Sequence, residues 1–267
     1  QLPAKWDAET DVLVAGSGIA GMSAAISALD KGAKVLVMEK GKNYGGCAII
    51  NGGIIALGGG TRTQKEHGVE DSPEKLYKKL TNPAHHEYRK NTPELVKKYS
   101  EWCPGTQVWL EEHGVKFLPT FTRPGKYDSQ HHESYHHIWW KDSGEGGRKP
   151  QPTGGFMTGR GIMMPYYEYF TGKGGQIFLE HKVVDVYVND QGAVVGAKVQ
   201  KPDGSIMNVK ANKGVVLAGG SWKANPELRR LTDPRFTENM ISTGYPFVAP
   251  DGSAILAGMR AGGMYVG

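Results

Sequence analysis

Apolar residues near the start of the chain form two short continuous runs with a helix-like stretch between them. Residues 12–15 (VLVA) are small or β-branched, the composition of a strand buried on both faces of a parallel sheet. Residues 22–31 contain Ala and Leu and stop at Gly32, which predicts a helix and its end. Residues 33–38 (AKVLVM) are the second run. This order predicts a strand, a helix and a second strand, the unit from which parallel α/β sheets are built.

Three glycines connect the first predicted strand to the helix. Gly16, Gly18 and Gly21 have the spacing G-x-G-x-x-G, which allows a sharp turn, the approach of a pyrophosphate and close packing of the helix on the sheet. The N-terminus of such a helix offers N–H groups and a partial positive charge to a phosphate. Glu39 follows the second strand, and its carboxylate can accept both hydroxyls of an adenosine ribose. Together these features predict dinucleotide binding; the alternative is a glycine turn in an ordinary α/β domain.

Glycine pairs continue after Glu39 and flank short apolar stretches up to residue 60. A backbone without bulky side chains can lie against a flat ligand, which is our interpretation of this segment. The alternative is a glycine-rich loop that has no ligand.

Residues 71–112 carry several signals of helix formation. Ser72 is predicted as the N-cap of a helix and Pro73 as its first residue. The same signal at residues 92–94 predicts a second helix, and residues 108–112 predict a third. We expect a helical insertion beside the nucleotide-binding part.

Residues 119–160 show little periodicity and hold four of the nine histidines. A metal or haem site, a substrate-facing loop and an exposed loop are all open interpretations of this stretch. His and Tyr side chains can donate hydrogen bonds and protons to a substrate. The spacing matches no standard zinc pattern, so we predict no metal site.

The last hundred residues predict a β-rich excursion followed by a return to the sheet. The predicted strands cover residues 176–180, 183–188, 193–200, 205–211 and 214–220, the last ending in a glycine pair. The predicted helices cover residues 161–171, 226–230 and 251–261. We expect the aromatic residues of the first of these helices in the core.

Composition narrows the class of protein. The chain has 267 residues, 39% of them hydrophobic and 22% charged, and no apolar run approaches the length of a membrane span. The net charge of +5 permits an anionic substrate, but the basic residues are scattered, so we predict no nucleic-acid partner. The two cysteines are too few to form a disulfide framework. The sequence begins at Gln1, so localisation stays open between the cytoplasm and export after removal of an N-terminal signal.

Several segments together resemble the flavoprotein family of succinate dehydrogenases, fumarate reductases and 3-ketosteroid dehydrogenases. The matching runs are DVLVAGSGIAGMSAAI with VLVMEK, GGCAIINGGIIALGGGT, KGVVLAGGSWKANPEL and APDGSAILAGMRAGG. The resemblance implies an α/β chain with a Rossmann-like FAD-binding (GR2-type) fold, a helical insertion and a β-rich excursion. In these terms residues 1–60 are the Rossmann half, 61–170 the helical and loop insertion, and 171–267 the remainder of the FAD-binding domain.

The resemblance implies FAD as the dinucleotide and assigns residues to it. The pyrophosphate would meet Gly16, Ser17, Gly18, Ala20 and Gly21, and the adenosine ribose Glu39, with Lys40 beside it. The flavin ring would be lined by Gly46, Cys47, Gly52 and Gly53, the adenine by Val183, and the pocket completed by Ala218, Gly219 and Asp251. Members with covalent FAD carry a His where this chain has Gly46, which implies non-covalent FAD.

The implied reaction is hydride transfer between flavin N5 and an activated C–C or C=C bond, as in a fumarate-reductase-like reduction of an unsaturated acid or enone. The alternatives are oxidation like that of a 3-ketosteroid 1-dehydrogenase, a non-catalytic flavin-binding electron-transfer subunit, and an NAD-binding Rossmann protein. Candidates for substrate contact are Tyr127, His132 and Tyr135. In the family, the substrate cap and a C-terminal flavin-binding segment follow the position of Gly262, so we expect a further segment or a second chain to complete the site. A redox partner is a separate expectation.

Overall fold

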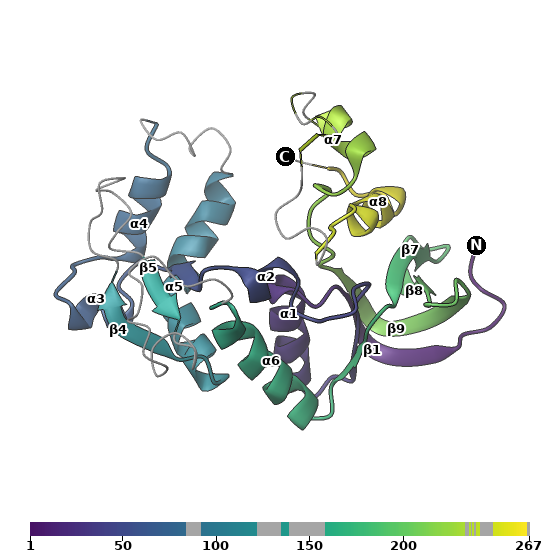
Figure 1. Ribbon diagram of the computed structural model, residues 1–267, viewed down its shortest axis with the longest axis horizontal. Coiled ribbons are helices and arrows are strands. Elements are labelled where there is room, and N and C mark those ends of the chain that lie inside the picture. The colour runs from purple at the N-terminus through teal and green to yellow at the C-terminus, as the bar shows by residue number, and fades with distance from the viewer. Residues whose placement is uncertain are drawn as a thin grey trace. The chain divides into compact units, whose positions relative to one another are not determined.

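A computed structural model describes residues 1–83, 92–121, 135–138, 158–232 and 248–265, together with residues 235, 237, 239 and 240 (Figure 1). The chain divides into two compact units. The first comprises Gln1–Ile49 and Tyr166–Val266, and the second comprises residues 50–165. Among the described helices none is long and apolar enough to cross a membrane.

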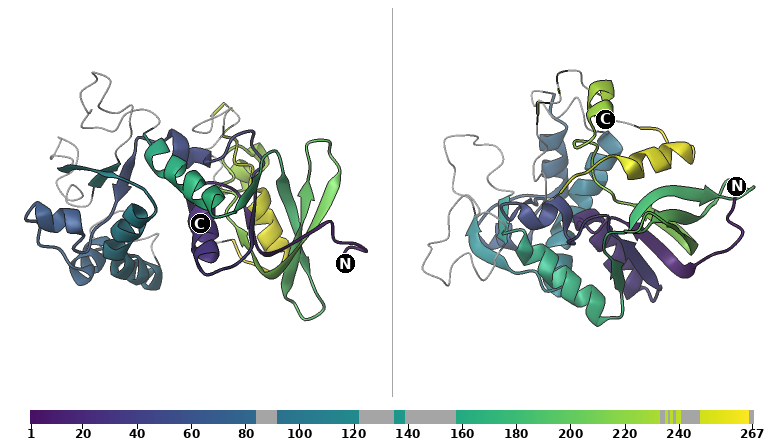
Figure 2. Two further views of the ribbon diagram at one scale, coloured as in Figure 1. Left: turned by 90° about the horizontal axis from the view of Figure 1, so that it is seen from below. Right: turned by 45° about the vertical axis from the view of Figure 1, so that its right-hand side comes forward.

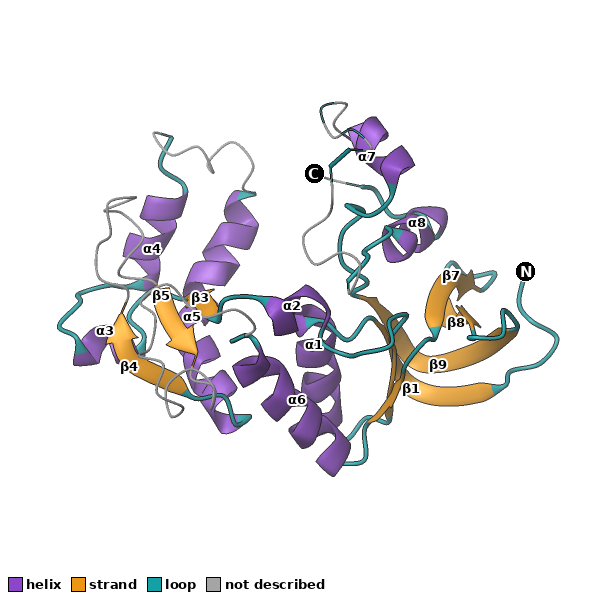
Figure 3. Cartoon of the chain, in the orientation of Figure 1, coloured by secondary structure: helices purple, strands orange, loops and turns teal. Residues whose placement is uncertain are grey.

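The sheet of the first unit has the strand order β6-β2-β1-β9-β8-β7. Figures 1 and 3 label β1, β9, β8 and β7 of this sheet. Its parallel part contains β1 (Ala8–Ala15), β2 (Val35–Met38), β6 (Gln176–Phe178) and β9 (Ile206–Leu217). Its antiparallel part joins β7 (Lys182–Val188) and β8 (Val194–Gln200) to β9. The predicted α/β fold with a β-rich excursion is confirmed.

β1 is buried on both faces, as its continuous apolar run requires. Val14 lies on the side of α1 (Ile19–Asp30), whose residues Met22 and Ile26 are fully buried. Leu13 belongs to a cluster that also contains residues of β2, β7, β8 and β9. A Cβ at Gly21 would lie 1.9 Å from the carbonyl oxygen of Gly16, so the helix packs on the strand at a distance that only glycine permits.

β9 corrects the sequence analysis, which expected separate strands at 205–211 and 214–220. The structure has one strand over Ile206–Leu217, because a β-bulge opposite β1 absorbs the irregular stretch. Thr10 pairs with Ala211 but Val12 pairs with Gly214, which has φ 154°. The same strand therefore continues from the antiparallel meander into the parallel centre of the sheet.

Helices flank this sheet. α6 (Arg160–Gly172) begins in the second unit, and its residues Tyr166 and Phe170 are buried as expected. α7 (Pro226–Thr232) follows the glycine pair after β9, and α8 (Ser253–Arg260) lies beside β7 (Figure 2). A short helix that was not predicted, α2 (Gly46–Ile50), begins within the glycine-rich segment after β2.

The second unit contains a small antiparallel sheet in the order β3-β5-β4. Its strands are β3 (Ile54–Ala56), β4 (Phe117–Phe121) and β5 (Tyr135–Ile138), none of which was predicted. The helices are α3 (Arg62–Glu66), α4 (Pro73–Leu80) and α5 (Pro93–Glu112). The predicted cap of α4 is confirmed, since the Ser72 hydroxyl accepts a hydrogen bond from the N–H of Lys75.

α5 is a second correction, because residues 93–112 form one helix where two were expected. Pro104 lies inside it. Val96, Cys103 and Leu110 are buried at helical spacing on both sides of the proline, so packing of one continuous face favours a single helix.

Candidate functional site

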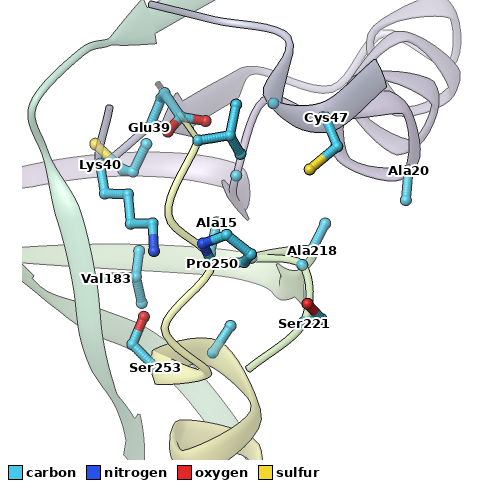
Figure 4. Close-up of a pocket in the computed structure, with 18 of the residues that line it drawn as sticks. Ala15, Ala20, Glu39, Lys40, Cys47, Val183, Ala218, Ser221, Pro250 and Ser253 are labelled. Carbon is cyan, nitrogen blue, oxygen red and sulfur yellow. The ribbon is translucent and has the colours of Figure 1, made fainter. Parts of the chain in front are cut away.

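A cavity of about 360 Å³ lies in the first unit, where β1, β2 and β9 reach their carboxyl ends (Figure 4). Ligands of open α/β sheets bind at this edge. The lining comes from seven segments: the end of β1, the start of α1, the end of β2, the start of α2, the start of β7, residues 218–221 and residues 248–254. The cavity is therefore assembled from parts that are far apart in the sequence.

The glycine-rich turn after β1 forms one wall of the cavity. Gly16 has φ 104°, and a Cβ there would lie 2.4 Å from the carbonyl oxygen of Ala218. Gly18 is the N-cap of α1, and a Cβ added to it would meet nothing within 4 Å. Gly18, Ile19 and Ala20 line the cavity, and no side chain caps α1 within the described chain. The helix thus presents its N-terminal backbone to the cavity, which suits a phosphate.

The buried carboxylate of Glu39 joins this turn to the loop after β2. Its Oε2 accepts hydrogen bonds from the N–H and the hydroxyl of Ser17, at 2.9 and 2.6 Å. Its Oε1 accepts from the N–H of Gly41 at 2.7 Å. A carboxylate has about four acceptor positions, so three of them are already used within the protein. Glu39 both lines the cavity and holds the turn in place.

The Ser17 hydroxyl extends this network by accepting a hydrogen bond from the N–H of Gly45, at 3.1 Å. The next residue, Gly46, has φ 51°, and a Cβ there would lie 3.4 Å from the Cα of Gly18. The two glycine-rich segments therefore approach each other backbone to backbone. Cys47 lies beside them in the cavity wall with an exposed thiol (Figure 4).

Three charged side chains meet at the opposite wall. The ammonium groups of Lys40 and Lys182 lie 3.0 and 2.8 Å from the two carboxylate oxygens of Asp251. Burial raises the pKa of Asp251, but the hydrogen bonds from Lys182, the Ser253 N–H and Lys40 outweigh it and hold the pKa well below its usual range. Asp251 is therefore ionised at neutral pH.

The structure brings most of the predicted cofactor residues together. Those that line the cavity are Gly16, Gly18, Ala20, Glu39, Lys40, Gly46, Cys47, Val183, Ala218 and Gly219. Ser17, Gly21 and Asp251 support it from behind through the contacts given above.

Other predicted residues are not placed at this cavity. Gly52 and Gly53 belong to the second unit, where the N–H of Ile138 donates to the carbonyl oxygen of Gly53. Tyr127 and His132 lie outside the described residues, and of Tyr135 only the backbone is described, paired with Ala56 in the small sheet.

Sequence reasoning missed several lining residues, among them Met38, Lys182, Ser221, Pro250 and Ser253. Each is next to, or within, a sequence motif that was recognised. Its position beside that motif, and not its residue type, could therefore have identified it as a lining residue. Among the described residues no group of three or more His, Cys, Asp or Glu side chains is arranged to hold a metal ion. Two of the four histidines of residues 119–160, His131 and His132, are outside that set.

The comparisons with known proteins agree with this geometry. A family model described as "FAD binding domain" matches residues 11–266. The acrylate reductase flavoprotein subunit of Shewanella woodyi is 29% identical over 93% of this chain, which covers 46% of that protein.

Two solved structures share the fold. A 3-ketosteroid-delta4-(5alpha)-dehydrogenase of Rhodococcus jostii RHA1 gives a TM-score of 0.78 at 30% identity, covering 98% of this chain and 55% of that one. A flavocytochrome c3 fumarate reductase gives a TM-score of 0.73 at 27% identity, covering 97% of this chain and 41% of that one. The chain thus spans about half, or less, of the length of these relatives.

Proposed function

Because the chain belongs to the family of FAD-binding domains, we propose that it is the cofactor-binding part of an oxidoreductase that acts on CH–CH groups. The direction we favour is reduction of an activated C=C bond in an unsaturated acid or enone. The observation that carries this proposal is the glycine-lined cavity at the sheet edge in a chain similar to an acrylate reductase flavoprotein subunit and a fumarate reductase. FAD is the cofactor.

The residues of the cavity fit FAD. A Cβ at Gly219 would lie 2.6 Å from the Cβ of Ala254, and one at Gly16 would collide with the backbone of Ala218, so both positions require glycine. The position beside Gly18 is open. Backbone therefore lines the space, as the close approach of a pyrophosphate requires.

The chain's own residues have distinct tasks in this proposal. The turn that contains Gly16 and Gly18 and the start of α1 would hold the pyrophosphate. Glu39 would accept a ribose hydroxyl with its remaining acceptor position, since its other positions bind Ser17 and Gly41. When bound, FAD supplies hydride transfer at flavin N5. We propose that it is held non-covalently, since the position before Cys47 is Gly46.

Anaerobic assay of the native protein tests the reaction. We expect reduced methyl viologen to be oxidised when fumarate or acrylate is added, at a rate proportional to bound FAD. The saturated analogues succinate and propionate are the matched controls, and they should cause no oxidation. Rates that are the same with saturated and unsaturated acids would contradict the proposal.

A ketosteroid-oxidising activity is the second candidate. The 30% identity and 98% coverage with the Rhodococcus jostii enzyme favour it. Its test is reduction of an artificial electron acceptor by a 3-ketosteroid in the same preparation. Turnover with the steroid and none with the acids would reverse the order of the two candidates. A protein that holds FAD and turns over neither would instead be a flavin-binding electron-transfer subunit.

We further propose that residues beyond this chain, on the same polypeptide or on a partner, complete the substrate site. The greater length of the relatives supports this. The intact mass of the natively purified protein, measured under denaturing conditions, distinguishes the two sources. A species of about twice 29.0 kDa indicates that the completing residues are on the same polypeptide, and a species of 29.0 kDa alone indicates that a partner supplies them.

Tyr127, His132 and Tyr135 stay our candidates for substrate contact. Tyr127→Phe, His132→Ala and Tyr135→Phe should each lower kcat while the flavin content per protein is unchanged. Unaltered rates would remove the residue concerned from the site.

A further inference from the structure

The carboxylate of Asp251 connects three separate segments of the first unit. Lys40 follows β2, Lys182 begins β7, and both ammonium groups bind this carboxylate. The N–H of Ser253, at the start of α8, donates to the same side chain at 3.1 Å. Figure 4 shows the Lys40 side chain extending across the cavity wall from the side of Glu39 toward the segment that carries Pro250, where it also donates to the carbonyl oxygen of Ala249.

Asp251 itself does not line the cavity, whereas both lysines do. The residues next to Asp251 supply a wall of the cavity through Val248, Pro250 and Ser253. The position of this wall relative to β2 and β7 is therefore set by a side chain that stands behind it.

The other side of this wall is fixed by the backbone. The N–H of Ala224 donates to the carbonyl oxygen of Pro250 at 2.8 Å, and the N–H of Gly252 donates to that of Ser221 at 3.1 Å. The Asn225 amide also binds the carbonyl oxygen of Asp251, at 3.2 Å. With residues 221–225 on one side and two lysines on the other, the wall is held across its width.

We propose that Lys40, Asp251 and Lys182 form a charged latch that retains FAD, with Asp251 as its positioning residue and Lys182 as a cofactor-contacting residue. The latch keeps residues 248–254 against β2 and β7 and keeps two ammonium groups in the cavity wall. An anionic dinucleotide is then met by cations that are already in place, although Glu39 adds a negative charge at the same edge. This goes beyond the proposed reaction and depends only on FAD binding.

The structure contains a matched control for this proposal. Arg260 at the end of α8 binds Asp185 of β7 at 3.1 Å and the carbonyl oxygen of Val184 at 2.7 Å. This ion pair joins the same two elements, α8 and β7, but neither Arg260 nor Asp185 lines the cavity. Its loss should loosen the packing of α8 without removing the latch.

The experiment measures FAD release from the holoprotein after dilution, followed by the rise in flavin fluorescence. We expect Asp251→Asn and Lys182→Met to raise the dissociation rate constant about tenfold, since losing one partner of a close charge pair acts mainly on dissociation. The conservative Lys182→Arg keeps a cation for the carboxylate and should stay within about twofold of the parent. The double variant should be no faster than the faster single variant, because both changes break one unit.

Thermal unfolding of the flavin-free proteins supplies the comparison with a merely structural role. Arg260→Met is expected to lower Tm about as much as Asp251→Asn while FAD release keeps the parental rate. Equal release rates in Asp251→Asn and the parent would overturn the latch, as would an Arg260→Met variant that releases FAD as fast as Asp251→Asn. If the unsubstituted protein fails to bind added FAD, both the latch and the cofactor assignment are overturned. Titration of the unsubstituted protein with FAD identifies that case by itself.

Discussion

Ser17 and Glu39 are joined twice, since the serine's backbone N–H and its hydroxyl both donate to one carboxylate oxygen, at 2.9 and 2.6 Å. Ser17→Ala removes the hydroxyl donor and also leaves the N–H of Gly45 without this acceptor. We expect the free energy of unfolding of the flavin-free protein to fall by about 2 kcal/mol, because buried hydrogen bonds to a charged group are lost. Urea unfolding followed by circular dichroism measures the change.

Ser205 is the matched control for that substitution. Its hydroxyl also donates to a carboxylate, that of Asp203, at 2.6 Å, but the pair lies on an exposed turn. Ser205→Ala should change the free energy of unfolding by less than about 0.5 kcal/mol. An equal loss of unfolding free energy in Ser17→Ala and Ser205→Ala would mean that burial of the Ser17 contact adds nothing to stability.

Gly18 and Gly21 belong to one motif, but alanine at Gly21 should mainly lower stability, whereas alanine at Gly18 should mainly weaken FAD binding. Gly21→Ala places a Cβ 1.9 Å from a backbone oxygen, so we expect a loss of at least about 3 kcal/mol in the free energy of unfolding. Gly18→Ala meets open space at φ −68°, so it should cost less than about 1 kcal/mol but weaken FAD binding at least tenfold. Chemical unfolding and FAD titration of both variants separate the two roles. Unchanged FAD affinity in Gly18→Ala would remove this glycine from the phosphate site.

Asp251 should contribute to stability over most of the pH range. Its folded-state pKa lies below that of the unfolded chain, so its contribution is present above the unfolded value of about 3.9 and is lost as pH falls toward the folded value. The difference in Tm between parent and Asp251→Asn is expected to be constant from about pH 8 to about pH 5 and to shrink below about pH 4. A difference that grows on acidification would contradict this sign.

The flavin should leave the protein on denaturation. With Gly46 before Cys47, trichloroacetic acid precipitation is expected to leave the yellow colour in the supernatant and none in the pellet. Colour that stays with the washed pellet would show a covalent bond and contradict our proposal of non-covalent FAD.

The nucleotide-binding start of the chain could be predicted because its signals are local. The glycines, the buried strands and Glu39 all lie within about thirty residues, and they occur in the order that a dinucleotide-binding unit requires. The cap at Ser72 is predictable for the same reason, since its partner is only three residues away.

The parts that were missed depend on distant residues. A proline inside a sequence, such as Pro104, usually predicts the end of a helix. Only the buried face that continues past it keeps α5 a single helix. The single strand β9 depends on a bulge opposite Thr10 and Val12, about 200 positions away. Lys182 is next to Val183, which was predicted as a cofactor residue, but a lysine at the start of a strand usually faces water. Only its ion pair with Asp251 holds it in the cavity wall.

The pairing of β1 with β9 has a consequence for biosynthesis. Ala8 pairs with Val209, so the centre of the sheet closes a loop of about 200 residues, and such non-local pairing is slow. Glu39 and Ser17 can meet as soon as the first βαβ unit leaves the ribosome, whereas Ala218 reaches the cavity only after β9 has docked. Until then one side of β1 is an open strand edge, the kind of surface that aggregates and that chaperones protect. This edge of β1 therefore stays unpaired during the synthesis of most of the chain.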